Sequence, residues 1–136
     1  MEPVKQEDSL GCAVACTAFI LRKSYAQSLS LFENGFRKAN TTGILCKEIV
    51  TALNLAGLKF EYKHIKGKNR IYRANTIVFL RRSKKYTNGH YLVRASKNKW
   101  MDPWLNFPNE EIEAGYRTRL PEKPIYAIFP KERVGS

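Results

Sequence analysis

The fold of this protein is decided by the segment CAVACTAFIL, residues 12–21, which joins a thiol to a short apolar run rich in helix formers. Arg22 and Lys23 follow it. Basic residues are typical of the last turn of a helix, where they complement the helix dipole. The sequence therefore predicts a helix that begins at Cys12 and ends near the two basic residues.

Cys12 stands at the expected start of this helix, and Gln6 lies in the polar segment before it. The first backbone N–H groups of a helix are unpaired, and together with the positive end of the dipole they favour an anion such as a thiolate. A thiolate that attacks a carbonyl creates a charged oxygen, to which the Cys12 N–H and the Gln6 amide would donate. This pair indicates a cysteine hydrolase.

A nucleophilic thiol usually needs a base, and the chain has two histidines, His64 and His90. Residues 90–95 are predicted to form a strand entered from a turn, and residues 99–102 a second strand that stops at a proline. This hairpin would place His90 and Asp102 opposite or diagonal to each other on one face, within reach of a hydrogen bond that fixes the imidazole tautomer. His64 has no carboxylate shortly after it and is predicted to be a solvated residue.

Gln6, Cys12 with its helix, the segment GHYLV (residues 89–93) and Asp102-Pro103 resemble the bacterial peptidases that cut double-glycine leader peptides from bacteriocins, which belong to the papain-like superfamily. The remaining segments follow in the family's order. They are a second helical stretch over residues 25–36, a third that begins at residue 42 and ends near residue 57, and an apolar strand over residues 76–80. The resemblance covers residues 3–130.

The resemblance implies a papain-like fold in which Cys12 is the nucleophile, His90 the general base and acid, and Asp102 the orienting carboxylate. It also implies that Gln6 is an oxyanion donor. Three further residues next to these in the sequence are predicted to line the substrate groove: Gly11, Gly89 and Trp104. The family usually has Asp-Cys-Gly at the nucleophile, where this chain has Gly-Cys-Ala, and the family member is often the leading domain of a transporter.

The other cysteines have simpler interpretations. Cys16 lies one helical turn after Cys12, and Cys46 lies among apolar positions at helical spacing, so both are predicted to be core residues. A metal site built from Cys12, Cys16 and a histidine is disfavoured, because no second cysteine pair or histidine pair supplies the other ligands. No metal and no cofactor are expected.

Composition limits the organisation of the chain. Its 136 residues, 43% of them hydrophobic, predict one domain over residues 1–134, with Gly135-Ser136 as a cloning remnant. Three cysteines suit reduced thiols, and the polar, acidic start is no export signal, so a cytoplasmic location is expected. The longest apolar run is too short to cross a bilayer.

Periodicity predicts an α+β architecture, with N-terminal helices packed on a C-terminal antiparallel sheet. Helical spacing dominates to about residue 57, and short strands are predicted at 59–65, 77–81, 90–95, 99–102 and 125–129. A short helix is predicted over residues 109–114, between the last two strands. The active site would lie in the groove between the helix that carries Cys12 and the sheet edge that carries His90.

The high net positive charge is the second feature of the sequence that bears on function. The net charge is +12, from 24 Lys and Arg against 12 Asp and Glu. Such an excess attracts acidic peptides or polyanions, although a solvated basic surface that keeps the protein soluble is an equal alternative. Many of the basic residues lie in one segment, residues 63–85: Lys63, Lys66, Lys68, Arg70, Arg73, Arg81, Arg82, Lys84 and Lys85.

Three classes of function remain open from the sequence. The favoured one is a thiol peptidase, or a related acyl-transfer enzyme such as a deamidase, that acts on an acidic peptide or protein through a thioester. The second is an inactive papain-like domain that binds a peptide in the same groove. The third is a basic nucleic-acid-binding protein, which the aromatic residues near the charges would suit but no binding motif supports. The oligomeric state is not predicted.

Overall fold

The computed structural model describes residues 2–66 and 71–131. Lys68, Arg70 and the proposed remnant at residues 135–136 lie outside the described residues. Among the described residues, four helices come first: α1 (Cys12–Leu21), α2 (Tyr25–Leu29), α3 (Gly35–Asn40) and α4 (Cys46–Leu55). Six strands follow: β1 (Phe60–His64), β2 (Ile77–Leu80), β3 (His90–Ser96), β4 (Lys99–Asp102), β5 (Gly115–Arg117) and β6 (Pro124–Pro130).

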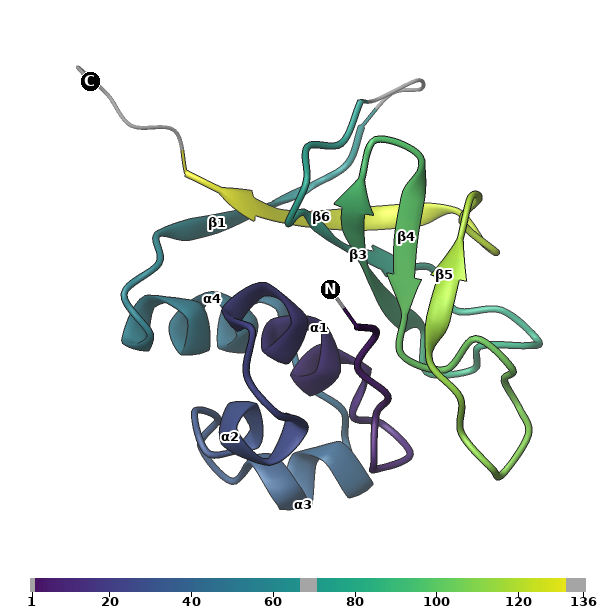
Figure 1. The fold of residues 1–136 in the computed structure, drawn as a ribbon, viewed down its shortest axis with the longest axis horizontal. Helices are drawn as coiled ribbons and strands as arrows, with labels where there is room; N and C mark the ends of the chain where they lie inside the picture. The colour runs from purple at the N-terminus through teal and green to yellow at the C-terminus, as the bar shows by residue number, and fades with distance from the viewer. Residues whose placement is uncertain (1, 67–70, 132–136) are drawn as a thin grey trace.

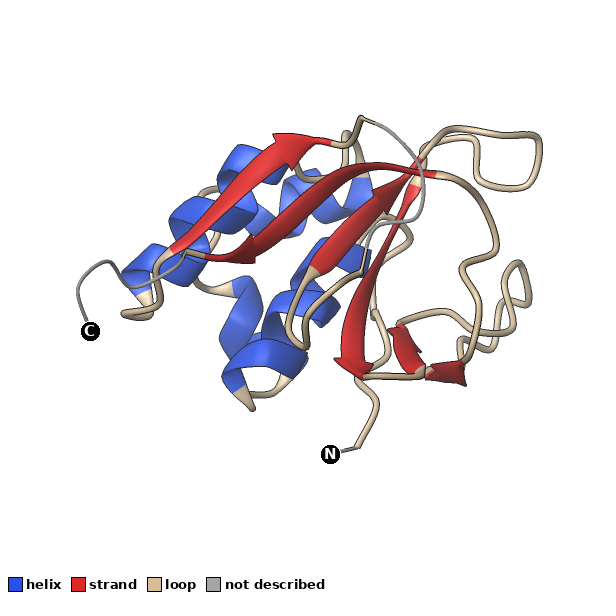
Figure 2. Ribbon diagram, turned by 90° about the horizontal axis from the view of Figure 1, so that it is seen from above, coloured by secondary structure: helices blue, strands red, loops and turns tan. Residues whose placement is uncertain are grey.

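The strands form one antiparallel sheet in the order β1-β6-β2-β3-β4-β5. The last strand in sequence, β6, lies between β1 and β2. After β5, at one edge of the sheet, the chain therefore crosses to a position next to β1 at the other edge (Figure 1). The helices gather on one face of the sheet (Figure 2). This arrangement confirms the predicted α+β architecture.

Helix α1 is the centre of the fold. It packs against α2, α4 and β3, and every residue from Ala13 to Phe19 is buried. Because α1 is apolar on all sides, it is stable only when protein surrounds it. Two buried hydroxyls bond its backbone: the Thr17 hydroxyl donates to Ala13 O at 2.8 Å, and the Ser28 hydroxyl of α2 donates to Val14 O at 2.9 Å.

The core lies between the helices and the sheet, and side chains alternate between the two faces of each strand. Ile77 of β2 and Val93 of β3 point to the helices, whereas Val78 and Leu92 belong to a smaller cluster with Trp100. Period-two alternation of this kind places every second residue on the same face of a sheet. The fold is thus fixed by one large core on the helical face and a small one on the other.

Two sequence expectations for the helices need correction. The stretch predicted over residues 25–36 is two helices, because α2 ends at Leu29 and α3 begins at Gly35 after Asn34, which has a positive φ of 53°. The helix expected from residue 42 begins at Cys46. Gly43, at φ 77°, interrupts the helical backbone before it.

The predicted helix over residues 109–114 is wrong. The segment is an irregular loop that leads into the short strand β5, which sequence analysis did not predict. The Asn106 side chain bonds Glu111 O and the Glu113 N–H, and Leu105 N donates to Glu113 O at 2.8 Å. These bonds between the two sides of the loop replace the bonds that a helix would make within the segment.

Candidate active site

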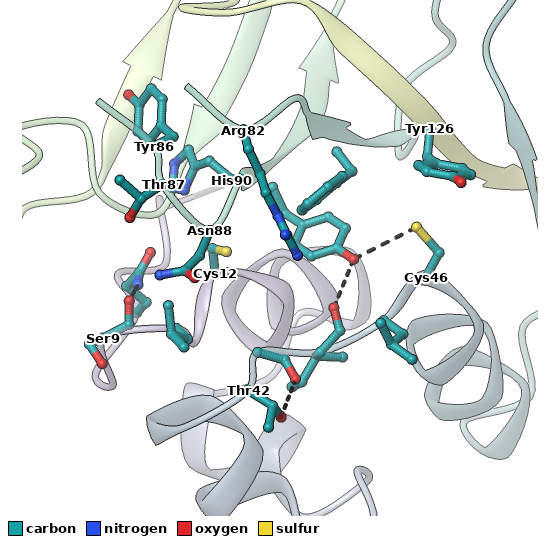
Figure 3. A pocket seen from close by; sticks show the side chains of 18 of the residues that line it. Ser9, Cys12, Thr42, Cys46, Arg82, Tyr86, Thr87, Asn88, His90 and Tyr126 are labelled. Carbon is teal, nitrogen blue, oxygen red and sulfur yellow. Dashed lines mark hydrogen bonds between the residues drawn. The ribbon is translucent and has the colours of Figure 1, made fainter. Parts of the chain in front are cut away.

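Cys12 is the first residue of α1, and its side chain is partly exposed at the end of the helix that faces the sheet. Gly11 is the N-terminal capping residue and supplies no side-chain cap. Because no side-chain cap covers this end, the first N–H groups of the helix stay available to an anion at the sulfur. Figure 3 shows Cys12 facing the same pocket as His90.

His90, the first residue of β3, is 4% exposed and bonds Asp102 through its Nε2 atom, with Oδ1 at 2.7 Å. The hydrogen bond predicted from the hairpin is therefore confirmed. The register pairs Val93 with Met101, which places Asp102 diagonal to His90. Because Nε2 is engaged by the carboxylate, Nδ1 is the ring nitrogen left to face the thiol.

The pKa of His90 reflects its two neighbours. Burial alone would lower it, since a charged ring is poorly solvated inside a protein. The hydrogen bond to Asp102, together with a hydrogen bond to Cys12 and the negative charges of both groups, outweighs burial and raises the pKa to about 9. At neutral pH the ring is therefore protonated and lies between a carboxylate and a sulfur atom.

Asp102 is fully buried, yet three donors keep it ionised. Burial would raise its pKa, but the hydrogen bond and charge of His90, the Trp104 N–H at 3.0 Å and the Arg117 guanidinium at 3.0 Å lower it below its usual value. A buried carboxylate with three donors is held firmly in one orientation. It can therefore orient the imidazole of His90.

Two residues that sequence analysis did not assign to this site complete it. Arg117, in β5, donates from Nη1 to Asp102 Oδ2. Tyr86, in the loop after β2, stacks on the ring of His90, with ring centres 4.9 Å apart and planes only 7° from parallel. Nothing in the local sequence marks Arg117, because β5 itself was not predicted. Tyr86 lies four residues before His90, and that proximity was the available signal.

Gln6 is buried and lines the same groove as Cys12, but its amide is already bonded. Its Nε2 donates to Asp8 O at 3.0 Å and to Ser9 O at 3.1 Å, while its Oε1 has no partner among the described residues. Its backbone N–H also donates to Pro103 O at 3.2 Å, which ties the N-terminal segment to the turn after Asp102. For Gln6 to donate to an oxyanion, the side chain must exchange one of its carbonyl partners for the substrate oxygen.

A groove of about 340 Å³ contains both Cys12 and His90. Its walls come from the segment over residues 42–47, the loop over residues 82–89 and the turn after Asp102. Of the residues predicted to line it, Gly89 and Trp104 do so. Gly89 has a positive φ of 73°, and a Cβ there would overlap the Phe79 ring, so only glycine fits before His90.

Gly11 does not line the groove. It is buried, and a Cβ added there would overlap the hydroxyl of Tyr25. That hydroxyl donates to the Asp8 carboxylate at 2.7 Å, and Asn40 donates to the other oxygen at 3.0 Å. The departure from Asp-Cys-Gly therefore has a structural reason: in this chain Tyr25 occupies the space that a side chain at position 11 would need.

The remaining cysteines differ from Cys12. Cys16 is fully buried, and burial, followed by the charges of Cys12 and Asp102, raises the pKa of its thiol well above the usual value. Cys46 lies at another part of the groove, 3.7 Å from the Tyr91 hydroxyl, and burial raises its pKa (Figure 3). All three thiols are unpaired.

Within residues 2–66 and 71–131 no cluster of three or more His, Cys, Asp or Glu side chains is arranged to hold a metal ion.

Comparison with known proteins supports the fold. No protein-family model matches the chain, and no curated protein matches it significantly. The peptidase domain of Streptococcus ComA, described as a bifunctional ABC transporter involved in a quorum-sensing pathway, aligns with a TM-score of 0.57 at 22% identity, over 96% of this chain and 98% of that domain. The peptidase domain of Streptococcus mutans ComA aligns with a TM-score of 0.51 at 20% identity, over 97% and 100%.

The chain therefore has the papain-like fold of these peptidase domains, as the sequence resemblance predicted. No helix in the described part of the chain is long and apolar enough to span a membrane.

Proposed function

We propose that this protein is a cysteine peptidase that cleaves a peptide substrate through a thioester at Cys12. The observation that carries this proposal is the 2.7 Å bond between His90 and Asp102, beside a thiol that shares the same groove. The peptidase domains with the same fold support it. The resemblance of the sequence to double-glycine leader peptidases makes a double-glycine peptide the first substrate to test.

In the acylation step the Cys12 thiolate attacks the substrate carbonyl carbon, and a C–S bond forms while the carbonyl π electrons move to oxygen. The Cys12 N–H and the Gln6 amide would donate to this oxygen. Protonated His90 then gives its proton to the leaving nitrogen as the C–N bond breaks. The products are a thioester and a free amine.

In the deacylation step His90, now neutral, removes a proton from water as the water oxygen attacks the thioester carbonyl. The C–S bond breaks, and the sulfur leaves as a thiolate beside the reprotonated imidazole. Asp102 holds the ring in place throughout and stabilises its positive charge. The peptide product leaves with a new carboxyl group, and the Cys12 thiolate beside protonated His90 is restored.

The decisive experiment exposes the protein to a panel of peptides with and without a double glycine, and follows the products by mass spectrometry beside Cys12→Ala. Cleavage by the wild-type protein alone is the expected result. Gln6→Ala should lower kcat/KM by about 10²- to 10³-fold, because it removes an oxyanion donor.

Two other outcomes would replace the proposal. Products that carry the mass increase of amide hydrolysis, with the peptide bond intact, would identify a deamidase that uses the same residues. Peptide binding that is equal in the wild-type protein and in Cys12→Ala, with no product from either, would identify an inactive binding domain. The cytoplasm is the compartment we propose, since three unpaired thiols suit a reducing environment.

A further inference from the structure

Two cations lie on the walls of the groove. Arg82 is in the loop after β2, and Lys47 is in the first turn of α4. Both side chains are exposed. The described residues that line the groove include no aspartate and no glutamate, so no carboxylate in the lining offsets the two charges.

Arg82 differs from its neighbour in the chain. Arg81 pairs with Glu122 through a bond of 2.8 Å from Nε, outside the groove lining. Arg82 makes no ion pair with any described residue, and its side chain points into the pocket in Figure 3. An arginine whose fork of N–H groups faces a groove and has no carboxylate is suited to bind one from a ligand.

Lys47 lines the groove from a different element, the first turn of α4. The carboxylate next to it in the chain, Glu48, is already engaged: it forms an ion pair with Lys38 and accepts from the Leu45 N–H at 3.0 Å. The Glu48 carboxylate is therefore bonded to the backbone at the start of α4 and to Lys38 of α3. Lys47 forms no ion pair with a described residue, although its charge, like that of Lys38, favours the Glu48 carboxylate, and its ammonium group can bind a molecule that occupies the groove.

We infer that this part of the groove binds acidic side chains of the substrate, so that the enzyme selects peptides with Asp or Glu close to the bond it cuts. The inference rests on the proposed peptidase function, because a peptide laid across Cys12 must pass the walls that carry Arg82 and Lys47. The net charge of +12 favours the same substrates during their approach.

An acidic peptide fits these observations better than a nucleic acid does. The two cations face the groove that also contains the thiol, where an extended peptide would lie. Binding to a phosphate backbone needs a track of basic residues, with bases stacked on exposed aromatic rings. Here the Tyr86 ring is buried and stacked on His90, so it is not free to stack on a base.

The test uses two pools of fluorogenic double-glycine peptides that are identical except that Asp and Glu in one pool are replaced by Asn and Gln in the other. The wild-type protein should cleave the acidic pool about fivefold faster or more, and the preference should shrink as salt is added. Arg82→Glu should abolish the preference, and a third pool that carries Lys at the same positions should be cleaved better by Arg82→Glu than by the wild-type protein.

Lys84→Glu is the matched control. Lys84 lies two residues from Arg82 on the same exposed loop but does not line the groove. The substitution changes the net charge by the same amount, so a general charge effect would appear in both variants. A loss of preference in Lys84→Glu as large as in Arg82→Glu would overturn the inference.

Failure of the inference is distinguishable from failure of the proposed function. Equal cleavage of the acidic and amide pools by the wild-type protein would overturn the inference and leave the peptidase intact. If no pool is cleaved, the proposed function fails. Binding of the same pools to Cys12→Ala, measured by fluorescence anisotropy, then decides the inference. Tighter binding of the acidic pool supports the inference, and equal binding of the two pools overturns it. Displacement of the bound peptide by a single-stranded oligonucleotide at physiological salt would overturn it in favour of nucleic acid.

Discussion

Arg117 donates a hydrogen bond of 3.0 Å to Asp102, from a strand that the sequence did not reveal. The bond reaches Oδ2, the oxygen that His90 does not use, so the carboxylate is held from both sides. Register pairs Trp100 of β4 with Arg117 of β5. The edge strand thus supports the carboxylate that bonds His90.

Replacing Arg117 with glutamine should raise the pKa of Asp102, because the positive charge that favours the carboxylate is lost. The acid limb of the pH profile of kcat should therefore move to higher pH, and the free energy of unfolding should fall by about 1–3 kcal/mol, since a buried acceptor loses its donor. Arg117→Lys, which keeps the charge, is the control. A glutamine variant with an unshifted acid limb would show that Arg117 acts only on stability.

The free energy of unfolding should decrease between pH 6.5 and pH 9.5. The pKa of His90 is about 9 in the folded protein and 6.5 in an ordinary histidine, so the folded state binds the proton more tightly. Its contribution is complete below pH 6.5 and is lost as the pH rises through about 9, at about 1.4 kcal/mol for each pKa unit. Urea denaturation at a series of pH values measures this.

Two variants separate His90 from other groups in that experiment. His90→Gln should flatten the dependence, whereas His64→Gln, at an exposed site in β1, should leave it unchanged. Cys12→Ala should move the decrease to lower pH, because it removes a hydrogen bond and a negative charge that raise the pKa of His90. An equal decrease in His90→Gln would assign the effect to another residue.

Iodoacetamide at neutral pH should label Cys12 well before Cys16 or Cys46. Burial raises the pKa of both other thiols, and Cys16 has no exposed surface, so the reactive thiolate is scarce at these positions. Peptide mapping by mass spectrometry gives the three rates. Asp102→Ala should slow the labelling of Cys12, whereas comparable rates at all three cysteines in the wild-type protein would contradict an activated nucleophile.

Gly11→Ala should destabilise the protein by about 1–3 kcal/mol, because its methyl group would overlap the Tyr25 hydroxyl and force the start of α1 to move. Tyr25→Phe alone should cost about 1 kcal/mol through the lost bond to Asp8. The double variant should be less destabilised than the sum of the two, as thermal or urea unfolding would show. Simple additivity would mean that the two residues do not compete for the same space.

The sequence by itself determined the elements whose causes are local. A run of helix formers after Cys12 gave α1, and two alternating segments around a polar turn gave the hairpin of β3 and β4, with the bond between His90 and Asp102. Short-range spacing is enough for such features, because the interacting residues belong to one helix or to one pair of adjacent strands.

Only the tertiary structure decided the features that depend on distant segments. Residues 109–114 are predicted to be helical, but bonds from Asn106 to this segment hold it as a loop that leads into β5, where Arg117 reaches Asp102. The Gln6 backbone N–H donates to Pro103 O, so the turn after Asp102, which lies far along the chain, holds the N-terminal segment in place. Competition for hydrogen-bond partners and space between segments far apart in the chain leaves no pattern in the local sequence.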